Sequence, residues 1–248
     1  MSQADTKPLL AVTGTRREAA LLRGRGVIAL CGGGDAVVLA DMIDDEAARH
    51  GGIAGIISFG MAGSLMRGVL VGDLVIGTEV DGPVETPCDP EWVAALAAAL
   101  PGVRRGIVYA DGRLLASRGV KGKVGSLSPA ACADMESHVA AAAALRHGVP
   151  LAVLRAISDP HNLSLPPAVE VAMAKGGGLA VGAMLGSVLR NPLQLFPLIG
   201  TLRQFARGFR ALKKATRRLD ARLAFDQRGL EAPLPPPRHR KRRRLPSD

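Results

Sequence analysis

Two acidic residues stand where a folded chain can present them to a ligand. Glu136 precedes the alanine-rich run 139–145, which predicts a helix, and Asp159 follows the apolar run 150–157, which predicts a buried strand. Carboxylates at a helix start and at a strand end commonly face the crevice of an α/β sheet, where ligands bind. The pair therefore indicates an enzyme.

Each of these residues also has a structural interpretation. Asp159 could cap the loop 160–166 that follows it, and Glu136 could simply be a favourable charge at a helix N-terminus. Asp134 is the better candidate for the N-cap of that helix, which leaves Glu136 free to point elsewhere.

Four short motifs, in the same order and spacing, resemble those of the purine nucleoside phosphorylase and methylthioadenosine nucleosidase superfamily. They are Phe-Gly-Met-Ala-Gly-Ser-Leu at 59–65, Val-Gly-Asp-Leu-Val at 71–75, Ala-Asp-Met-Glu-Ser-His at 133–138 and Leu-Arg-Ala-Ile-Ser-Asp at 154–159. The resemblance extends from about Leu9 to about Ser187. The Met-Glu-Ser-His version and the long basic C-terminus are most similar to the hopanoid-associated phosphorylase branch, whose members are understood to remove adenine from adenosylhopane.

The resemblance implies a three-layer α/β fold, with a central mixed sheet flanked by helices, and an enzyme that cleaves an N-glycosidic bond. That reaction builds positive charge on the ribose and negative charge on the leaving base. By resemblance, Asp159 protonates or hydrogen-bonds the imidazole-side ring nitrogen of adenine, Glu136 accepts hydrogen bonds from the ribose hydroxyls, and Met135 packs against the sugar. The other expected substrate-binding residues are Gly60, Met61, Ala62, Gly63 and Ser158.

The loop 14–18 bears on the choice between phosphorolysis and hydrolysis. Nucleosidases of the superfamily use a glutamate in this loop to activate water, whereas phosphorylases use basic residues here for phosphate. Glu18 is therefore a catalytic candidate, although in an alignment without gaps it lies one residue before the position of the nucleosidase glutamate. The residues expected to bind phosphate are Arg16, Arg17 and Ser64. The alternative for the two arginines, which is the more common case, is that they are exposed on a solvated loop and bind nothing. Both reactions stay open, with a slight preference for phosphorolysis.

Composition narrows the class of protein. A chain of 248 residues, 48% of them hydrophobic, can bury a full single-domain core. Residues 1–185 carry 16 Lys and Arg against 18 Asp and Glu, whereas residues 186–248 carry 16 against 4. This distribution favours an anchoring or docking segment over a nucleic-acid-binding protein. Three scattered cysteines and a polar N-terminus predict a cytoplasmic protein without disulfides, and no metal or cofactor is expected beyond phosphate as a co-substrate.

Patterning predicts alternating strands and helices, hence a mainly parallel or mixed sheet. The expected strands are 9–13, 27–31, 55–59, 73–77, 105–109 and 150–157, and the expected helices 19–23, 35–49, 87–100, 135–145 and 168–189. We expect a catalytic domain over 1–189, an amphipathic basic helical extension over 190–228 and a disordered Pro/Arg-rich tail over 229–248.

The extension carries a stripe of apolar residues at helical spacing opposite a broad basic side. Its apolar members are Leu198, Leu202, Phe205, Phe209, Leu212, Leu219 and Leu223. The pattern is typical of an interfacial membrane helix, which predicts a peripheral protein at the inner face of the membrane, although the stripe could instead pack on the body or on a second subunit. A spanning helix is excluded because 179–202 is interrupted by Arg190, Pro192 and Pro197.

The preferred prediction is an enzyme that releases adenine from the lipid-linked nucleoside adenosylhopane, by phosphorolysis or hydrolysis, and that forms a homo-oligomer as its relatives do. One alternative is a soluble methylthioadenosine or adenosylhomocysteine nucleosidase. A second, non-enzymatic alternative is a degenerate fold that acts as a membrane or nucleic-acid adaptor through its tail.

Overall fold

The computed structural model describes residues 7–167, 169 and 195–229. Within them, eight strands form one sheet in the order β2-β1-β3-β7-β6-β4-β5, and β8 pairs with both β3 and β4. The strands are β1 (Leu9–Thr13), β2 (Val27–Cys31), β3 (Gly55–Ser64), β4 (Leu74–Asp81), β5 (Thr86–Pro87), β6 (Arg104–Ala110), β7 (Cys132–Asp134) and β8 (Leu151–Asp159).

The sheet is mixed, as expected, and part of it closes on itself. β1 pairs in parallel with β2 and β3, and β3 pairs in parallel with β8, whereas β8 pairs antiparallel with β4 and β3 antiparallel with β7. Because β6 joins β4 to β7, the strands β3, β8, β4, β6 and β7 pair in a closed circuit. All nine residues of β8 are buried, which is what a strand covered on both faces requires.

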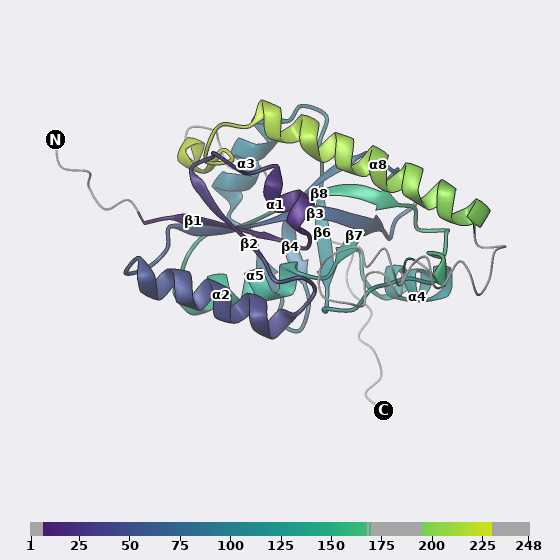
Figure 1. The fold of residues 1–248 in the computed structure, drawn as a ribbon, viewed down its shortest axis with the longest axis horizontal. Helices are drawn as coiled ribbons and strands as arrows, with labels where there is room; N and C mark the ends of the chain where they lie inside the picture. Colours follow the sequence, from purple (N-terminus) through teal and green to yellow (C-terminus); the bar gives the residue numbers. More distant parts are fainter. Residues whose placement is uncertain (1–6, 168, 170–194, 230–248) are drawn as a thin grey trace.

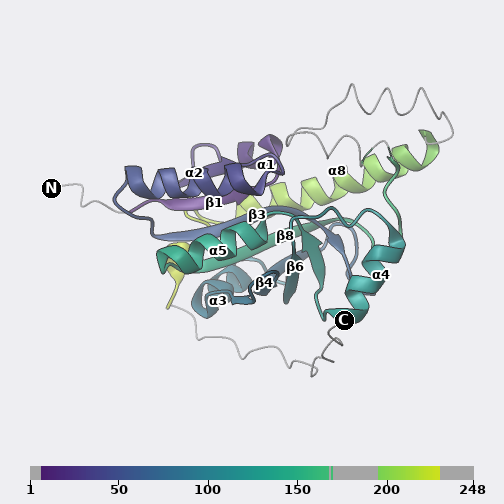
Figure 2. The ribbon, with the colours of Figure 1, turned by 90° about the horizontal axis from the view of Figure 1, so that it is seen from below.

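Helices cover both faces of the sheet, so the predicted fold class is confirmed. They are α1 (Arg16–Ala20), α2 (Ala36–Arg49), α3 (Pro90–Ala99), α4 (Arg118–Leu127), α5 (Ser137–His147) and α8 (Leu195–Arg218), followed by the short 3₁₀ helix η2 (Phe225–Gln227). Figure 1 shows α8 along one side of the sheet, with α2 and α5 on the opposite side. Figure 2 shows α2 and α5 side by side and α4 at the far end of the molecule. The cysteines are free thiols, and Cys88 and Cys132 are buried.

Three of the described helices and strands, β5, β7 and α4, were not predicted from the sequence. β5 and β7 are too short to give a periodic signal, and α4 contains Gly119, Gly122 and Gly125, which disfavour an isolated helix. Gly125 is required by packing, because a Cβ there would lie 2.8 Å from the carbonyl oxygen of Leu65. The helix predicted over 19–23 instead begins at Arg16, and the helix predicted over 168–189 lies outside the described residues except for position 169.

Four of the seven residues of the apolar stripe of α8 are buried in the fold, which is the alternative that the sequence left open, whereas Leu202 is exposed. Leu198, Leu212, Leu219 and Leu223 are buried, and a Cβ at Gly208 would lie 2.7 Å from the carbonyl oxygen of Ile157 in β8. Burial of a helix stripe on a sheet is the ordinary source of helix stability. Among the described residues, no helix is both long and apolar enough to cross a membrane.

The segment after α8 is also fixed to the body. The indole Nε1 of Trp92 on α3 donates to the carbonyl of Leu223 at 2.9 Å, and its ring meets the Phe225 ring edge-on at 4.9 Å between centroids. The Arg25 Nη1 atom donates to the carbonyl of Asp220 at 2.7 Å. The part of the predicted extension that the structure describes is therefore packed on the α/β body.

Candidate active site

A cavity of about 150 Å³ lies where the ends of β3, β7 and β8 meet the loop after β1. Its polar lining consists of Thr15, Glu18, Arg113, Lys121, Asp134, Glu136, Ser158 and Asp159, and its larger apolar side chains are those of Met61, Leu65, Leu114, Leu115, Met135, Leu165 and Phe205. Polar groups that converge in a mainly apolar hollow are the usual make-up of a small-molecule site.

Arg155 is the central cation beside this cavity, and sequence reasoning missed it. It lies in the middle of β8 with no exposed surface. Its Nε atom is 2.9 Å from Asp134 Oδ2, its Nη1 atom is 4.0 Å from Glu136 Oε2, and its Nη2 atom donates to Ser137 Oγ at 3.1 Å. An arginine inside an apolar strand must be paired with carboxylates, and that signal was available in the sequence.

The N-cap of α5 is Glu136 and not the predicted Asp134, but Asp134 still accepts from the first backbone N–H groups of the helix, and the Glu136 side chain is left to face the cavity. The Oδ1 atom of Asp134 accepts from the backbone N–H groups of Glu136 at 2.9 Å and Ser137 at 2.7 Å. The Glu136 side chain makes no capping bond and lies over Gly14, where a Cβ would be 2.8 Å from Oε1.

Burial raises the pKa of Glu136 to about 8. The charge of Arg155 lowers this pKa, and the charges of Asp134 and Glu18 raise it further. Glu136 therefore shares its site with two other carboxylates and one cation, and its raised pKa favours the protonated form of this carboxyl near neutral pH.

Glu18 enters the cavity because of a capping box at the start of α1. Its Oε2 atom accepts from the backbone N–H of Thr15 at 2.7 Å and from the Thr15 hydroxyl at 2.8 Å, and its Oε1 atom accepts from the Met61 N–H at 2.8 Å. Burial raises the pKa of Glu18, although Arg155 acts in the opposite direction. Gly60 makes room for this arrangement, because a Cβ there would lie 2.8 Å from Glu18 Oε1 and 2.6 Å from Arg155 Nη1.

Asp159 lies at the end of β8 in a buried ion pair with Lys121 of α4. Its Oδ2 atom accepts from Lys121 Nζ, and its Oδ1 atom accepts from the Ser158 hydroxyl at 2.9 Å. Lys121 Nζ also lies 3.1 Å from the carbonyl oxygen of Pro160 and 3.2 Å from that of Leu163, so it fixes the loop after β8. Sequence reasoning missed Lys121 because it stands in a glycine-rich segment that predicts no helix.

The structure brings most of the predicted site residues together, but not the expected phosphate contacts. Besides the three carboxylates, the cavity is lined by Met61, Ala62, Gly63, Met135 and Ser158. Ser64 Oγ donates to the carbonyl of Met66 at 3.0 Å and does not line the cavity.

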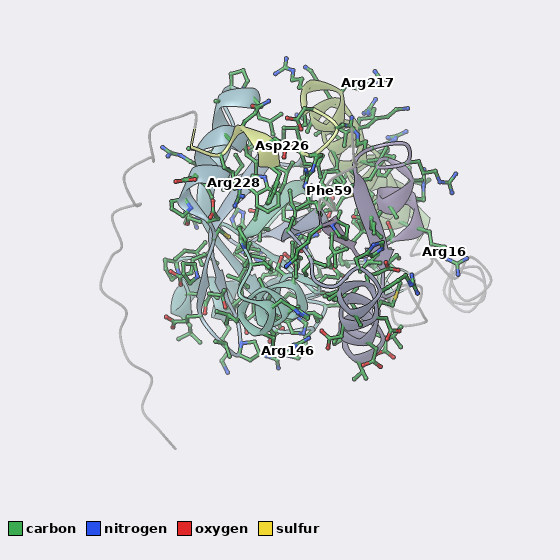
Figure 3. All side chains as sticks on the ribbon, turned by 90° about the vertical axis from the view of Figure 1, so that its left-hand side faces the viewer. Arg16, Phe59, Arg146, Arg217, Asp226 and Arg228 are labelled. Atoms are coloured by element: carbon green, nitrogen blue, oxygen red, sulfur yellow. The ribbon has the colours of Figure 1, made fainter. Side chains whose placement is uncertain are left out.

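Arg16 and Arg17 are exposed and do not line the cavity either. The Arg17 guanidinium lies 5.1 Å from the centre of the Phe209 ring, and Figure 3 shows Arg16 at the outer edge of the molecule. Within the described segments, no group of histidine, cysteine, aspartate and glutamate side chains could hold a metal ion.

Comparison with known proteins identifies the family of this chain. The family model described as "Phosphorylase superfamily" matches residues 5–175, so the chain belongs to that family. It is therefore an enzyme of nucleoside glycosidic-bond cleavage, as predicted. The comparison with curated proteins gives no significant match.

Solved structures show the same fold at low sequence identity. The S-adenosylhomocysteine nucleosidase of Streptococcus pyogenes has a TM-score of 0.60 at 18% identity and covers 77% of this chain and 99% of its own. The 5'-methylthioadenosine/S-adenosylhomocysteine nucleosidase of Helicobacter pylori has a TM-score of 0.60 at 16% identity, over 75% and 99%. Futalosine hydrolase of Helicobacter pylori has a TM-score of 0.59 at 15% identity, over 75% and 98%.

Proposed function

We propose that this enzyme hydrolyses the N-glycosidic bond of adenosylhopane and releases adenine. The observation that carries the choice of water over phosphate is the position of Glu18, which lines the cavity and is buried. Burial raises the pKa of Glu18, and a buried carboxylate with a raised pKa is a suitable general base for water. The cationic candidates for phosphate, Arg16 and Arg17, lie outside the cavity lining.

In the proposed reaction the three carboxylates act on three parts of the substrate. Glu136 accepts hydrogen bonds from the ribose hydroxyls. Glu18 takes a proton from the attacking water while the water oxygen forms a bond to the anomeric carbon. The carbon–nitrogen bond breaks with its electron pair on adenine, and the Lys121–Asp159 pair supplies the proton that the imidazole-side ring nitrogen needs. Positive charge on the ribose is stabilised by the neighbouring carboxylates.

The lipid-linked substrate is supported by the apolar wall of the cavity. Leu114, Leu115, Leu165 and Phe205 line it together with the reactive groups, and Leu165 continues into a buried cluster with Val169 and Leu198. A long apolar substituent on the ribose gains free energy by burial against such a wall. The resemblance of the Met-Glu-Ser-His motif to the hopanoid-associated branch points to the same substrate.

A methylthioadenosine or adenosylhomocysteine nucleosidase is the second candidate, favoured by the nucleosidases among the structures of the same fold. Measuring adenine release from adenosylhopane in detergent micelles, and from methylthioadenosine and adenosylhomocysteine, separates the two. We expect the highest kcat/KM with adenosylhopane; a higher value with either soluble nucleoside would reverse the assignment.

The same assay tests the attacking group. Running it with and without inorganic phosphate, in water enriched in oxygen-18, should give a free sugar hydroxyl that carries the label. Release that depends on phosphate and yields a sugar 1-phosphate would show phosphorolysis and overturn the role of Glu18.

A further inference from the structure

The outward side of α8 is a continuous basic surface. Seven cations on this helix are exposed, and the helix Leu195–Arg218 contains no carboxylate. They are Arg203, Arg207, Arg210, Lys213, Lys214, Arg217 and Arg218. Figure 1 shows α8 running along the outside of the molecule, and Figure 3 shows Arg217 near its upper edge. This surface, called the α8 basic face below, is left over after the apolar stripe has packed on the sheet.

The α8 basic face adjoins the mouth of the cavity at one end. Phe205 of the same helix lines the cavity, whereas Leu202 and Ile199, three and six residues earlier, are 38% and 40% exposed. Helical spacing places Ile199 on the same side as Arg203, Arg210 and Arg217. This helix therefore presents exposed apolar residues near the site and then a little over four turns, from Arg203 to Arg218, that carry the cations.

We infer that the α8 basic face docks the enzyme on the surface of an anionic lipid bilayer, with the Ile199–Leu202 end placed toward the acyl chains. The purpose of this docking rests on the proposed function, since a lipid-linked nucleoside resides in the bilayer and must reach the cavity past Leu202 and Phe205. The binding itself does not depend on catalysis. Because the apolar stripe is buried in the fold, attachment is mainly electrostatic and reversible, not the insertion of an amphipathic helix.

Charge complementarity favours a bilayer as the occupant. A cationic helix about 36 Å long, with its charges in one plane, matches a flat anionic surface. The two exposed apolar side chains suit a lipid surface but have no counterpart on a phosphate backbone. The residues before 186 carry a slight excess of acidic groups, so attraction is concentrated at the C-terminal part of the chain.

The test is co-sedimentation of the full-length protein with phosphatidylcholine vesicles that contain or lack phosphatidylglycerol. The variant Arg203→Glu/Arg210→Glu/Arg217→Glu should lower partitioning to anionic vesicles by at least about 100-fold, since each Lys or Arg near such a surface contributes about fivefold. Binding should also weaken as salt is raised. The matched control is Arg67→Glu/Arg105→Glu/Lys123→Glu, which changes the net charge equally at exposed positions on other elements.

A full-length variant with glutamine throughout 238–244 separates the α8 basic face from the basic tail. We expect it to keep most of the α8-dependent binding. Loss of binding in the tail variant with wild-type binding in the α8 variant would overturn the proposal, as would equal binding to both vesicle types. If the α8 variant loses affinity for duplex DNA but not for anionic vesicles, the face binds nucleic acid instead. Thermal unfolding midpoints show whether each variant is folded. None of these binding measurements requires catalytic activity, so they can succeed even if the proposed reaction is wrong.

Discussion

Lys121 and Asp159 form an ion pair in which only 2% and 7% of the two side chains are exposed. The pair joins α4 to the end of β8 and forms part of the cavity wall. A buried pair is a weak source of stability as a whole, but removal of one partner leaves an uncompensated charge. Lys121 is therefore a positioning residue for Asp159 and for the loop that follows it.

Lys121→Met should lower both stability and turnover. Loss of one partner from a buried pair typically costs about 3–5 kcal/mol, which urea denaturation would measure. Lys121→Met/Asp159→Asn should recover part of that stability because no lone charge remains, yet it should stay inactive. A single variant with wild-type stability would contradict the buried ion pair, and a change in KM alone would contradict its link to the chemical step.

Asp159→Asn should abolish turnover while the fold persists, because the amide cannot supply a proton to the leaving base. General acid catalysis typically contributes about 100- to 10,000-fold. Adenine release at several pH values and a circular-dichroism spectrum form the measurement. The assignment fails if the folded variant keeps more than about a tenth of wild-type activity.

Glu18→Gln should reduce kcat by a similar factor, about 100-fold or more, with a smaller change in KM. Since burial raises the pKa of Glu18, wild-type kcat/KM should rise with pH as this carboxyl loses its proton, and the rise should disappear in the variant. Arg16→Gln/Arg17→Gln is the matched control on the same short helix and should stay close to wild type. A large loss in the control with full activity of Glu18→Gln would instead support phosphate binding at this helix.

We expect Glu136 to make the wild-type fold less stable as pH rises. Its pKa of about 8 in the folded protein lies above the ordinary value of 4.5, so the folded state binds the proton more tightly than the unfolded state. The contribution to stability is full below pH 4.5 and is lost as pH rises through about 8. Unfolding free energies measured from pH 5 to 9 should therefore fall more steeply for wild type than for Glu136→Gln. Parallel curves would show that Glu136 is ionised throughout.

Glu136 also carries a prediction for the substrate. A nucleoside that lacks one ribose hydroxyl should react poorly with the wild-type enzyme, and Glu136→Gln should add little further loss. Full additivity of the two changes would argue against direct contact between this carboxylate and the sugar.

The sequence predicts those parts of this fold that depend on local periodicity. β1 and β2 have the predicted bounds, and β8, α2 and α5 differ by a residue or two, because continuous apolar runs and capped amphipathic segments are local signals. α4 was missed because its three glycines disfavour a helix, and one of them, Gly125, is required for close packing against Leu65, which is a tertiary requirement. Its Lys121, and with it the partner of Asp159, was missed for the same reason.

Glu18 shows why a motif offset is a poor guide to geometry. One residue of displacement along a strand would turn a side chain to the other face, but on the short helix α1 the capping box with Thr15 directs the carboxylate inward. The apolar stripe of α8 shows a different limit of sequence analysis. Amphipathic spacing indicates that one side of a helix is covered, but it does not tell whether a membrane, the body of the protein or a second subunit covers it.

Three of the four carboxylates that line the cavity each lie over a glycine: Glu136 over Gly14, Glu18 over Gly60 and Asp159 over Gly63, and a Cβ at any of these would come within 2.8 Å of a carboxylate oxygen. A methyl group at one of these positions would push a single reactive group out of place while leaving its charge intact. Among related chains, replacement of any of the three glycines would thus mark a copy that has kept the architecture but given up the chemistry, even where all three acids remain.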